Sequence, residues 1–154
     1  MKFLMQFVLV VFVVHVLAVK DGDTIQVEDN SDTAKAIYNI RLYGIDAPEK
    51  KQAYGMEAKA CLTDLIMGKD VKLQLISGDV HGRLVCKVFT SDNIYVNEYL
   101  AANGCAWYYE EFAKGDTALQ TAQEHAQACK LGLWSQPNPV APWDFRKQQK
   151  EVKP

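Results

Sequence analysis

Short runs of strand-forming residues dominate the first two thirds of this 154-residue chain, and one helical stretch interrupts them. Over 24–28, 37–43 and 71–75, apolar residues alternate with polar ones, as they do in a strand with one buried face. Two further strand-like runs, 84–90 and 94–96, are separated by the turn residues Ser, Asp and Asn. Short strands in this number predict a small barrel.

Three helical stretches accompany these strands. Residues 54–65 place apolar side chains at helical spacing, and Gly68 follows as a stop. A short helix is predicted over 97–104 with Asn97 as its N-cap, and a longer one over 116–132. We therefore predict an α+β, mainly β architecture: a five-stranded OB-fold barrel with three packed α-helices.

The composition is that of one ordinary globular domain, with 49% apolar and 23% charged residues. The formal net charge is −2, whereas a protein that binds nucleic acid by bulk electrostatics is clearly basic. Any contact with nucleic acid must therefore rest on a local patch of arginine and lysine. After Trp134 the chain becomes irregular and proline-rich, and it ends in a basic tail over 146–153 that we expect to be solvated.

An apolar segment over residues 3–19 leaves the N-terminus open to three interpretations. The preceding Lys2, the apolar core and small Ala18 resemble a secretory signal peptide, yet the segment runs without a spacer into Asp21-Gly22-Asp23-Thr24. It is a signal peptide that overlaps the first strand, an uncleaved membrane anchor, or a long valine-rich core strand with an apolar lead-in. We expect export or membrane attachment: a secreted, periplasmic or membrane-anchored protein.

Four cysteines, at positions 61, 86, 105 and 129, lack the close-pair spacing of a zinc site. Cys61 falls on the apolar face of a predicted helix and Cys86 in a predicted strand, which favours buried thiols. Export would allow one or two disulfides, and four cysteines permit three pairings among which the sequence does not choose.

Carboxylates and arginines gather in three short motifs. These are Asp21-Gly22-Asp23-Thr24, the segment from Arg41 to Asp46-Ala47-Pro48-Glu49, and His81-Gly82-Arg83. Each motif alone has a plain structural explanation as a hairpin turn or a helix cap. Together they supply what phosphodiester chemistry requires, because carboxylates bind a hard cation and guanidinium groups grip phosphate oxygens through paired hydrogen bonds.

In this order the motifs resemble those of the thermonuclease family, the staphylococcal-nuclease-like domain. The resemblance extends over about residues 12–146, after an apolar segment over 1–18 that overlaps its first strand and before the basic tail over 147–154. The matching segments are Val19 to Thr24, Ile40 to Leu42, Gly44 to Glu49, Tyr54-Gly55 with Glu57-Ala58, Gly82-Arg83, Val96-Asn97, Gly104 with Ala106-Trp107, Gly132 to Trp134, and Pro142-Trp143 with Phe145-Arg146.

The resemblance implies a calcium-dependent endonuclease that hydrolyses phosphodiester bonds of DNA and RNA and leaves 3′-phosphate ends. It implies that Ca²⁺ is held by the carboxylates of Asp23 and Asp46 and by the backbone carbonyl of Ala47. Glu49 would activate or position the attacking water.

The same resemblance assigns Arg41 and Arg83 to stabilising the phosphorane-like transition state. We further predict that Tyr109 stacks on a base of a single-stranded or frayed substrate. The expected protein is a monomer without an obligate protein partner, and any membrane contact would be made through residues 3–19.

A non-catalytic OB-fold module that binds nucleic acid is the alternative. Degenerate copies of the domain lack the acidic and arginine residues, so the complete set favours an enzyme. The chain departs from the family at His81, where an aromatic residue is usual, and at Glu110-Glu111, where basic residues are usual. An acidic pair near the substrate groove predicts weakened binding of the phosphate backbone.

Overall fold

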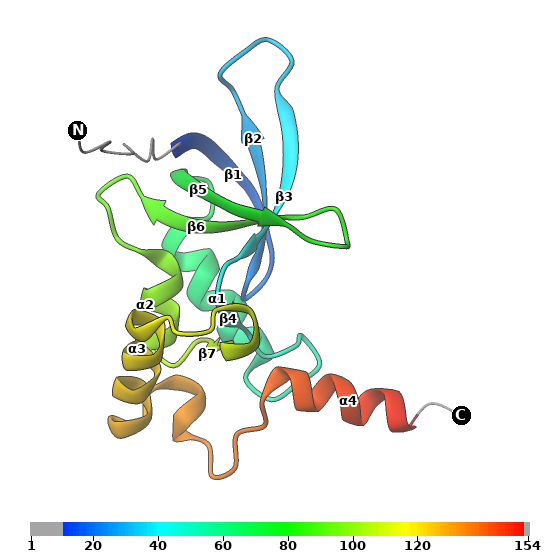
Figure 1. Ribbon diagram of the computed structural model, residues 1–154, viewed down its shortest axis with the longest axis vertical. Coiled ribbons are helices and arrows are strands. Elements are labelled where there is room, and N and C mark those ends of the chain that lie inside the picture. Colours follow the sequence, from blue (N-terminus) through cyan, green and yellow to red (C-terminus); the bar gives the residue numbers. More distant parts are fainter. Residues whose placement is uncertain (1–10, 153–154) are drawn as a thin grey trace, which may run out of the picture.

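Five strands close into a barrel in the order β1-β2-β3-β6-β5, which confirms the predicted barrel (Figure 1). The structure is a computed structural model that describes residues 11–152. A second sheet of two short strands, β4 and β7, lies outside the barrel. The strands are β1 (Val11–Asp21), β2 (Thr24–Asp29), β3 (Ala36–Leu42), β4 (Ile45–Asp46), β5 (Asp70–Gly78), β6 (Leu84–Thr90) and β7 (Trp107–Tyr108).

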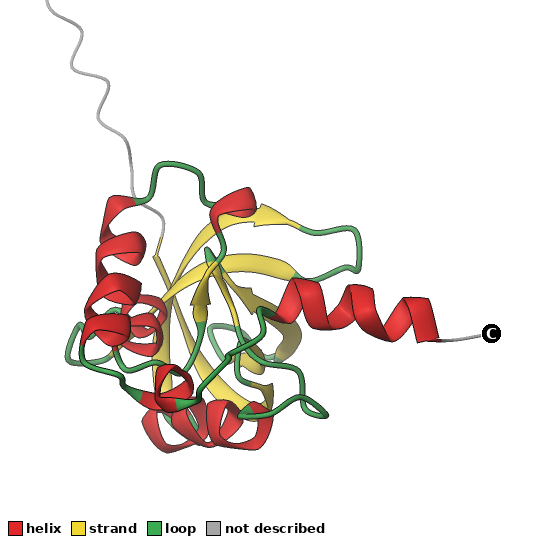
Figure 2. Ribbon diagram, turned by 90° about the horizontal axis from the view of Figure 1, so that it is seen from below, coloured by secondary structure: helices red, strands yellow, loops and turns green. Residues whose placement is uncertain are grey.

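Four α-helices and two 3₁₀ turns accompany the strands in the described part of the chain. Helices α1, α2 and α3 gather at one end of the barrel, whereas α4 extends away from it toward the C-terminus (Figures 1 and 2). The helices are α1 (Gly55–Ile66), α2 (Val96–Ala102), α3 (Thr117–Ala128) and α4 (Pro142–Val152), and the 3₁₀ turns are η1 (Glu110–Phe112) and η2 (Gly132–Ser135).

Strand β1 closes the barrel because it pairs with a different neighbour along each half. Val11 to His15 pair with β5, and His15 to Asp21 pair with β2. Two register shifts in the second half accompany this change of partner. Residues 11–19 of the apolar segment therefore lie in a barrel strand, which both the first and the third interpretation include, and residues 3–10 lie outside the described range. Within residues 11–152, no helix is long and apolar enough to cross a membrane.

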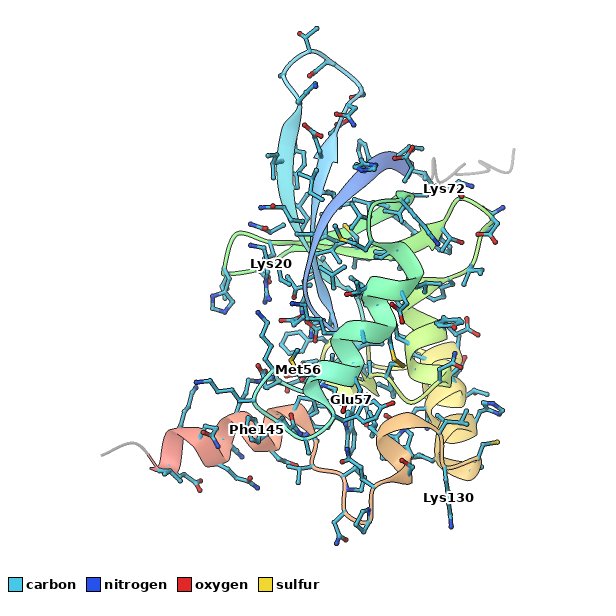
Figure 3. All side chains as sticks on the ribbon, turned by 180° about the vertical axis from the view of Figure 1, so that it is seen from behind. Lys20, Met56, Glu57, Lys72, Lys130 and Phe145 are labelled. Carbon is cyan, nitrogen blue, oxygen red and sulfur yellow. A yellow bond between two sulfur atoms is a disulfide. The ribbon has the colours of Figure 1, made fainter. Side chains whose placement is uncertain are left out.

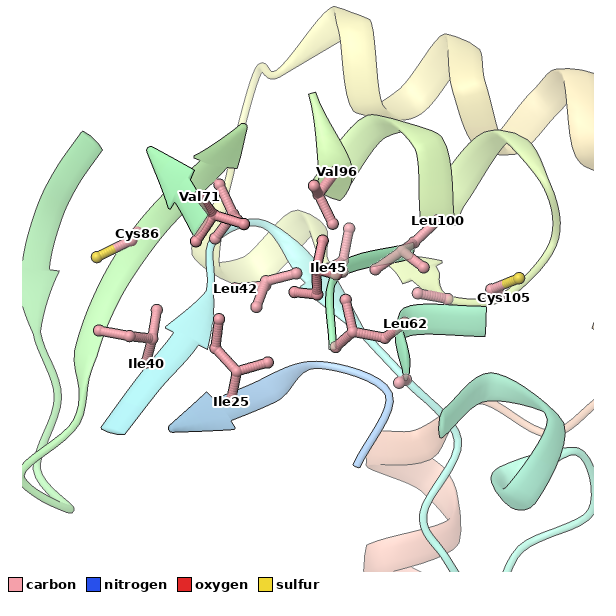
Figure 4. Close-up of a cluster of buried hydrophobic side chains, with 14 of the residues drawn as sticks. Ile25, Ile40, Leu42, Ile45, Leu62, Val71, Cys86, Val96, Leu100 and Cys105 are labelled. Atoms are coloured by element: carbon pink, nitrogen blue, oxygen red, sulfur yellow. The ribbon is translucent and has the colours of Figure 1, made fainter. Parts of the chain in front are cut away.

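The core fills the barrel and continues between the barrel and its helices (Figure 4). Ile25 and Ile40 are fully buried inside the barrel, while Leu62 of α1 and Leu100 of α2 meet Ile45 where the helices begin to cover it. Burying side chains of this size stabilises the fold by about 1.5–3 kcal/mol each. The core thereby fixes the ends of β1, β3 and β4, where the acidic and arginine motifs lie.

The predicted strand over 94–96 is wrong. Tyr95 makes one isolated bridge with Phe89, and Val96 already begins α2. Asn97 is likewise no N-cap: it is fully buried, accepts a hydrogen bond from the Val88 amide at 3.0 Å and donates one to the Tyr43 carbonyl at 2.8 Å. Its side chain satisfies backbone groups at the point where β3 and β6 separate.

The basic tail is largely helical. Residues 147–152 continue α4, which starts with Pro142, a residue preorganised for the first helical position. Trp143 and Arg146 are three residues apart and share one face of this helix. Arg146, expected to be solvated, instead reaches back to the barrel, as described below.

Cys61 of α1 and Cys105, after α2, form a disulfide, which is one of the three pairings the sequence left open. Cys86 is a buried thiol in β6 and Cys129 is an exposed thiol after α3. Burial raises the pKa of Cys86 to about 11, so this thiol stays protonated at neutral pH.

We expect a thiol reagent such as Ellman's reagent to label Cys129 rapidly in the native, unreduced protein and to leave Cys86 unmodified. The reagent reacts with thiolates, and Cys86 is both buried and neutral. Unfolding in urea without reductant should release the second thiol, and prior reduction should expose all four cysteines. Four reactive thiols in unreduced, unfolded protein would contradict the disulfide.

Candidate active site

A cleft of about 870 Å³ opens at the side of the barrel where β1, β3 and β5 end. Its walls are built from the β1–β2 turn, the segment after β3, the β5–β6 turn, and residues that follow β7. The structure thereby brings together every residue that the sequence assigned to catalysis, metal binding or substrate contact: Asp23, Arg41, Asp46, Ala47, Glu49, Arg83 and Tyr109.

Asp23 links the β1–β2 turn to the segment after β4. Its Oδ2 accepts a hydrogen bond of 2.8 Å from the Ala47 amide, and its Oδ1 accepts one of 3.0 Å from the Thr24 hydroxyl. Gly22 permits this close approach, because a Cβ there would lie 2.7 Å from the Ala47 Cβ. Close packing therefore requires the glycine of this turn, and the turn presents the buried carboxylate of Asp23 to the cleft.

Arg41 lies between the two predicted metal ligands. It comes from β3, directly across from Thr24 of β2. Its Nη2 is 3.4 Å from Asp23 Oδ2 and 3.3 Å from Asp46 Oδ1, while Nη1 donates to the Leu42 carbonyl at 2.9 Å. These contacts hold a guanidinium, little exposed to solvent, beside two buried carboxylates.

Arg146 is a site residue that the sequence analysis missed. Its Nη2 donates to Asp46 Oδ2 at 2.7 Å, and its Nη1 donates to Asp46 Oδ1 at 3.2 Å and to Glu49 Oε1 at 2.8 Å. One guanidinium thus joins both carboxylates from the opposite end of the chain. The signal was the segment Pro142-Trp143 with Phe145-Arg146, which matched the family but received no role.

Arg83 lines the cleft from the β5–β6 turn and is oriented by that turn. Asp79 Oδ1 accepts hydrogen bonds from the amides of His81 and Arg83, both at 2.9 Å, and Asp79 Oδ2 accepts one from Arg83 Nε at 2.6 Å. Within residues 11–152, the Nη groups of Arg83 have no hydrogen-bond partner. The side chain is therefore fixed at Nε and keeps both terminal nitrogens for a ligand.

Tyr109 lines the cleft and packs against two aromatic side chains. Its ring stacks on Trp143 of α4 at a centroid distance of 5.1 Å and an angle of 5°, and Phe112 meets it edge-on at 4.8 Å. Both Tyr109 and Phe112 line the cleft, whereas Glu110 and Glu111 do not. The acidic pair thus lies outside the walls that the aromatic residues form.

Buried negative charge is concentrated around Asp23. Burial, and then the neighbouring charge of Asp23, raise the pKa of Asp21 to about 7. Burial also raises the pKa of Asp46 to about 6. The hydrogen bond from Arg146 lowers this pKa, whereas the charge of Asp23 raises it further. The pKa of Asp23 itself is lowered: burial opposes this, but Arg41 and the hydrogen bonds from Asp21 and the Ala47 amide outweigh it.

We expect Asp21→Asn to stabilise the protein at pH 8 by on the order of 1–2 kcal/mol, since one pKa unit corresponds to about 1.4 kcal/mol and solvent screens part of it. Between pH 4 and 7 the folded chain keeps a proton on Asp21 that the unfolded chain has lost, so stability falls as pH rises through this window. Urea unfolding in EDTA at pH 5 and pH 8 measures the difference.

The gain from Asp21→Asn should shrink at pH 5, where the wild-type carboxyl is already protonated. Asp64→Asn is the matched control, because it makes the same substitution at a carboxylate that is exposed on α1. Equal effects of Asp21→Asn at both pH values would contradict the raised pKa.

Comparison with known proteins identifies the family of the chain. Residues 39–136 match the family model described as "Staphylococcal nuclease homologue". The chain is 41% identical over 132 residues to a protein of Escherichia coli named "Uncharacterized endonuclease", with 86% of this chain and 83% of the relative covered. A Haemophilus influenzae protein of the same name is 37% identical over 136 residues, covering 88% and 74% of the two chains.

A plant relative shares the domain within a longer protein. "Probable staphylococcal-like nuclease CAN2" of Oryza sativa subsp. japonica is 38% identical over 116 residues, which are 75% of this chain and 31% of the relative. The matched range contains Arg41, Asp46, Glu49 and Arg83, all of which line the cleft. The chain belongs to the staphylococcal nuclease homologue family.

Proposed function

We propose that the protein is an endonuclease that hydrolyses phosphodiester bonds of DNA and RNA. The observation that carries this proposal is the convergence of three acidic side chains, Asp23, Asp46 and Glu49, with Arg41 and Arg83 on one cleft. The names of the bacterial relatives, which call them endonucleases, support the same activity.

The charge of the cleft fits a divalent cation. Asp21, Asp23, Asp46 and Glu49 carry four negative charges when ionised, while Arg41 and Arg146 offset two of them. Within residues 11–152, no three acidic, histidine or cysteine side chains already form a metal cage, and both Asp46 oxygens accept hydrogen bonds from Arg146. Burial and mutual repulsion nevertheless raise the pKa of Asp21 and Asp46, so a bound cation would stabilise their ionised forms.

We therefore propose that Asp23, Asp46 and the Ala47 carbonyl hold Ca²⁺, a hard cation that takes such oxygen ligands. When bound, the ion would neutralise negative charge and polarise the phosphoryl group. These three ligands leave room in the coordination shell for waters and a substrate oxygen.

Glu49 is proposed to activate or position the water. It is half-exposed, lines the cleft and lies within Arg146's reach, so its carboxylate can face both solvent and the phosphate. In this scheme the water forms a bond to phosphorus and gives its proton to Glu49, and the bond from phosphorus to the 5′ oxygen breaks. The 5′ oxygen takes a proton from solvent water as it leaves, and Glu49 returns its proton to solvent, so the products are a 3′-phosphate and a 5′-hydroxyl.

Arg41 and Arg83 are proposed to stabilise the charge that develops on the phosphate oxygens. Arg41 is held among buried carboxylates. Arg83 is held at Nε by Asp79, and its Nη groups have no hydrogen-bond partner within residues 11–152. Donors fixed before the reaction need not reorganise during it, so they stabilise the transition state more than the ground state.

A single-stranded or frayed substrate fits the aromatic wall. Tyr109 is supported from behind by Trp143, so its remaining face can stack on a base. The low net charge means that binding would depend on the local arginines.

Export is proposed on separate grounds. The apolar segment over 3–19 and the Cys61–Cys105 disulfide both suit an oxidising compartment. The intact mass and cell fraction of the native protein decide this, and a reduced protein found in the cytosol would contradict it.

We expect the purified protein to cut denatured plasmid and RNA in Ca²⁺ and to stop in EDTA. Glu49→Gln and Arg83→Lys should each lower kcat by on the order of 10²-fold, because the first removes the proton acceptor and the second replaces a forked donor by a point charge. End-labelled fragments identify the 3′-phosphate, and thermal unfolding checks that each variant is folded.

Asp46→Asn is the control for the metal site and should raise the Ca²⁺ concentration required for half-maximal cutting. Tight binding of nucleic acid without cutting, in Ca²⁺ or any other divalent ion, would instead support the non-catalytic OB-fold module.

A further inference from the structure

Arg146, which lies outside the residues matched by the family model, makes two short charged contacts in the cleft. Its guanidinium grips both oxygens of Asp46, at 2.7 and 3.2 Å, and reaches Glu49 at 2.8 Å. Arg41, by comparison, approaches Asp46 only to 3.3 Å. Arg146 is therefore the main cationic partner of the two carboxylates that flank Ala47-Pro48.

Helix α4 holds Arg146 in this place through an aromatic contact one turn earlier. Trp143 stacks on Tyr109 and meets Trp107 edge-on at 5.5 Å, so the first turn of α4 is packed against the segment around β7. The side-chain Nε2 of Gln52 donates to the Val140 carbonyl just before the helix, and the backbone amide of Glu49 donates to Gln52 Oε1 at 3.1 Å. The loop that carries Glu49 is thus tied to the start of α4.

Figure 3 shows α4 from behind. This helix, labelled at Phe145, leaves the body of the molecule on the side of the first turn of α1, where Met56 and Glu57 lie. A helix anchored at its first turn and projecting afterwards can deliver one side chain accurately, while its later turns contribute little.

The carboxylate of Glu49 depends on this contact for a defined orientation. Within residues 11–152, Arg146 is the only hydrogen-bond partner of the Glu49 side chain, which is 38% exposed. Asp46 is 2% exposed, so its hydrogen bonds with Arg146 are shielded from water. They are therefore stronger than the contact between Arg146 and Glu49. Because the Arg146 guanidinium is held by the buried carboxylate of Asp46, it can orient the exposed carboxylate of Glu49.

We propose that Arg146 is a positioning residue: it orients Glu49 against Asp46 and so makes the docking of α4 a requirement for turnover. This inference rests on the proposed nuclease function. A displacement of about 1 Å in a reacting group costs on the order of 10²-fold in rate, and loss of the Arg146 fork frees Glu49 to move by at least that much.

The first test replaces Arg146 and compares kcat with KM on a single-stranded oligonucleotide in Ca²⁺. Arg146→Ala should lower kcat by on the order of 10²-fold and change KM by less than about threefold. Arg146→Lys, which keeps the charge, should still lose at least about tenfold, because one ammonium does not reproduce the fork. Lys150→Ala, on the exposed part of α4, is the matched control and should leave both constants unchanged.

The second test asks whether Arg146 acts through Glu49. If it does, Arg146→Ala should add less than about threefold to the loss already caused by Glu49→Gln. Methylguanidine at millimolar concentration should restore part of the Arg146→Ala turnover, whereas methylammonium at equal ionic strength should not. A residue with a merely structural role gives additive losses and no rescue.

Thermal unfolding separates the two roles when activity falls. Should Arg146→Ala fail to fold, the Arg146→Lys variant and its double mutant with Glu49→Gln decide the same question. Wild-type kcat in Arg146→Ala, or additive losses without rescue, would overturn the inference while leaving the nuclease intact. Absence of cutting by the wild-type chain would overturn the proposed function itself.

Discussion

The hydrogen bond from the Ala47 amide to Asp23 is the interaction on which the site depends. It joins the β1–β2 turn to the segment that leaves β4, two parts of the chain that the barrel alone would bring near but not fasten. Because Gly22 has no side chain, the two backbone segments approach closely, and the buried carboxylate of Asp23 can then accept the Ala47 hydrogen bond. Asp46, Glu49 and Arg41 take their places relative to this junction.

Placing several carboxylates in one cleft works against the stability of the fold. Asp21 and Asp46 have raised pKa values because burial and a like-charged neighbour disfavour their ionised forms. A chain selected only for stability would have replaced one of them by an amide or an apolar residue. Local conflict of this kind is expected where a protein binds or transforms a ligand, and the surrounding core must compensate for it.

Much of the barrel and most of the site could be predicted because their signals are local. Strands β2, β3 and β5 contain stretches with a buried and an open face, so apolar and polar residues alternate along those stretches. The strand predicted at 94–96 failed because three residues carry too little periodicity to separate a single bridge from a helix start. Helix α4 was not predicted from the sequence because only its first turn packs against the rest of the protein.

The site shows the same division between local and distant signals. Asp23, Arg41, Asp46 and Glu49 stand in compact motifs, whereas Arg146 meets its partners across separations of 97 and 100 residues. No spacing rule reveals such a contact, and none chooses the Cys61–Cys105 pairing across 44 residues. Both required knowing how α1, α2 and α4 are placed around the barrel.

The divided pairing of β1 also bears on how the chain could be trimmed. A protease that cut after Ala18 would take away every residue of β1 that pairs with β5. The far side of β5 would then present a row of unsatisfied amides and carbonyls, which is the kind of open edge that recruits strands from other molecules. Cleavage ahead of Val11, by contrast, would leave every one of these β1–β5 pairs in place.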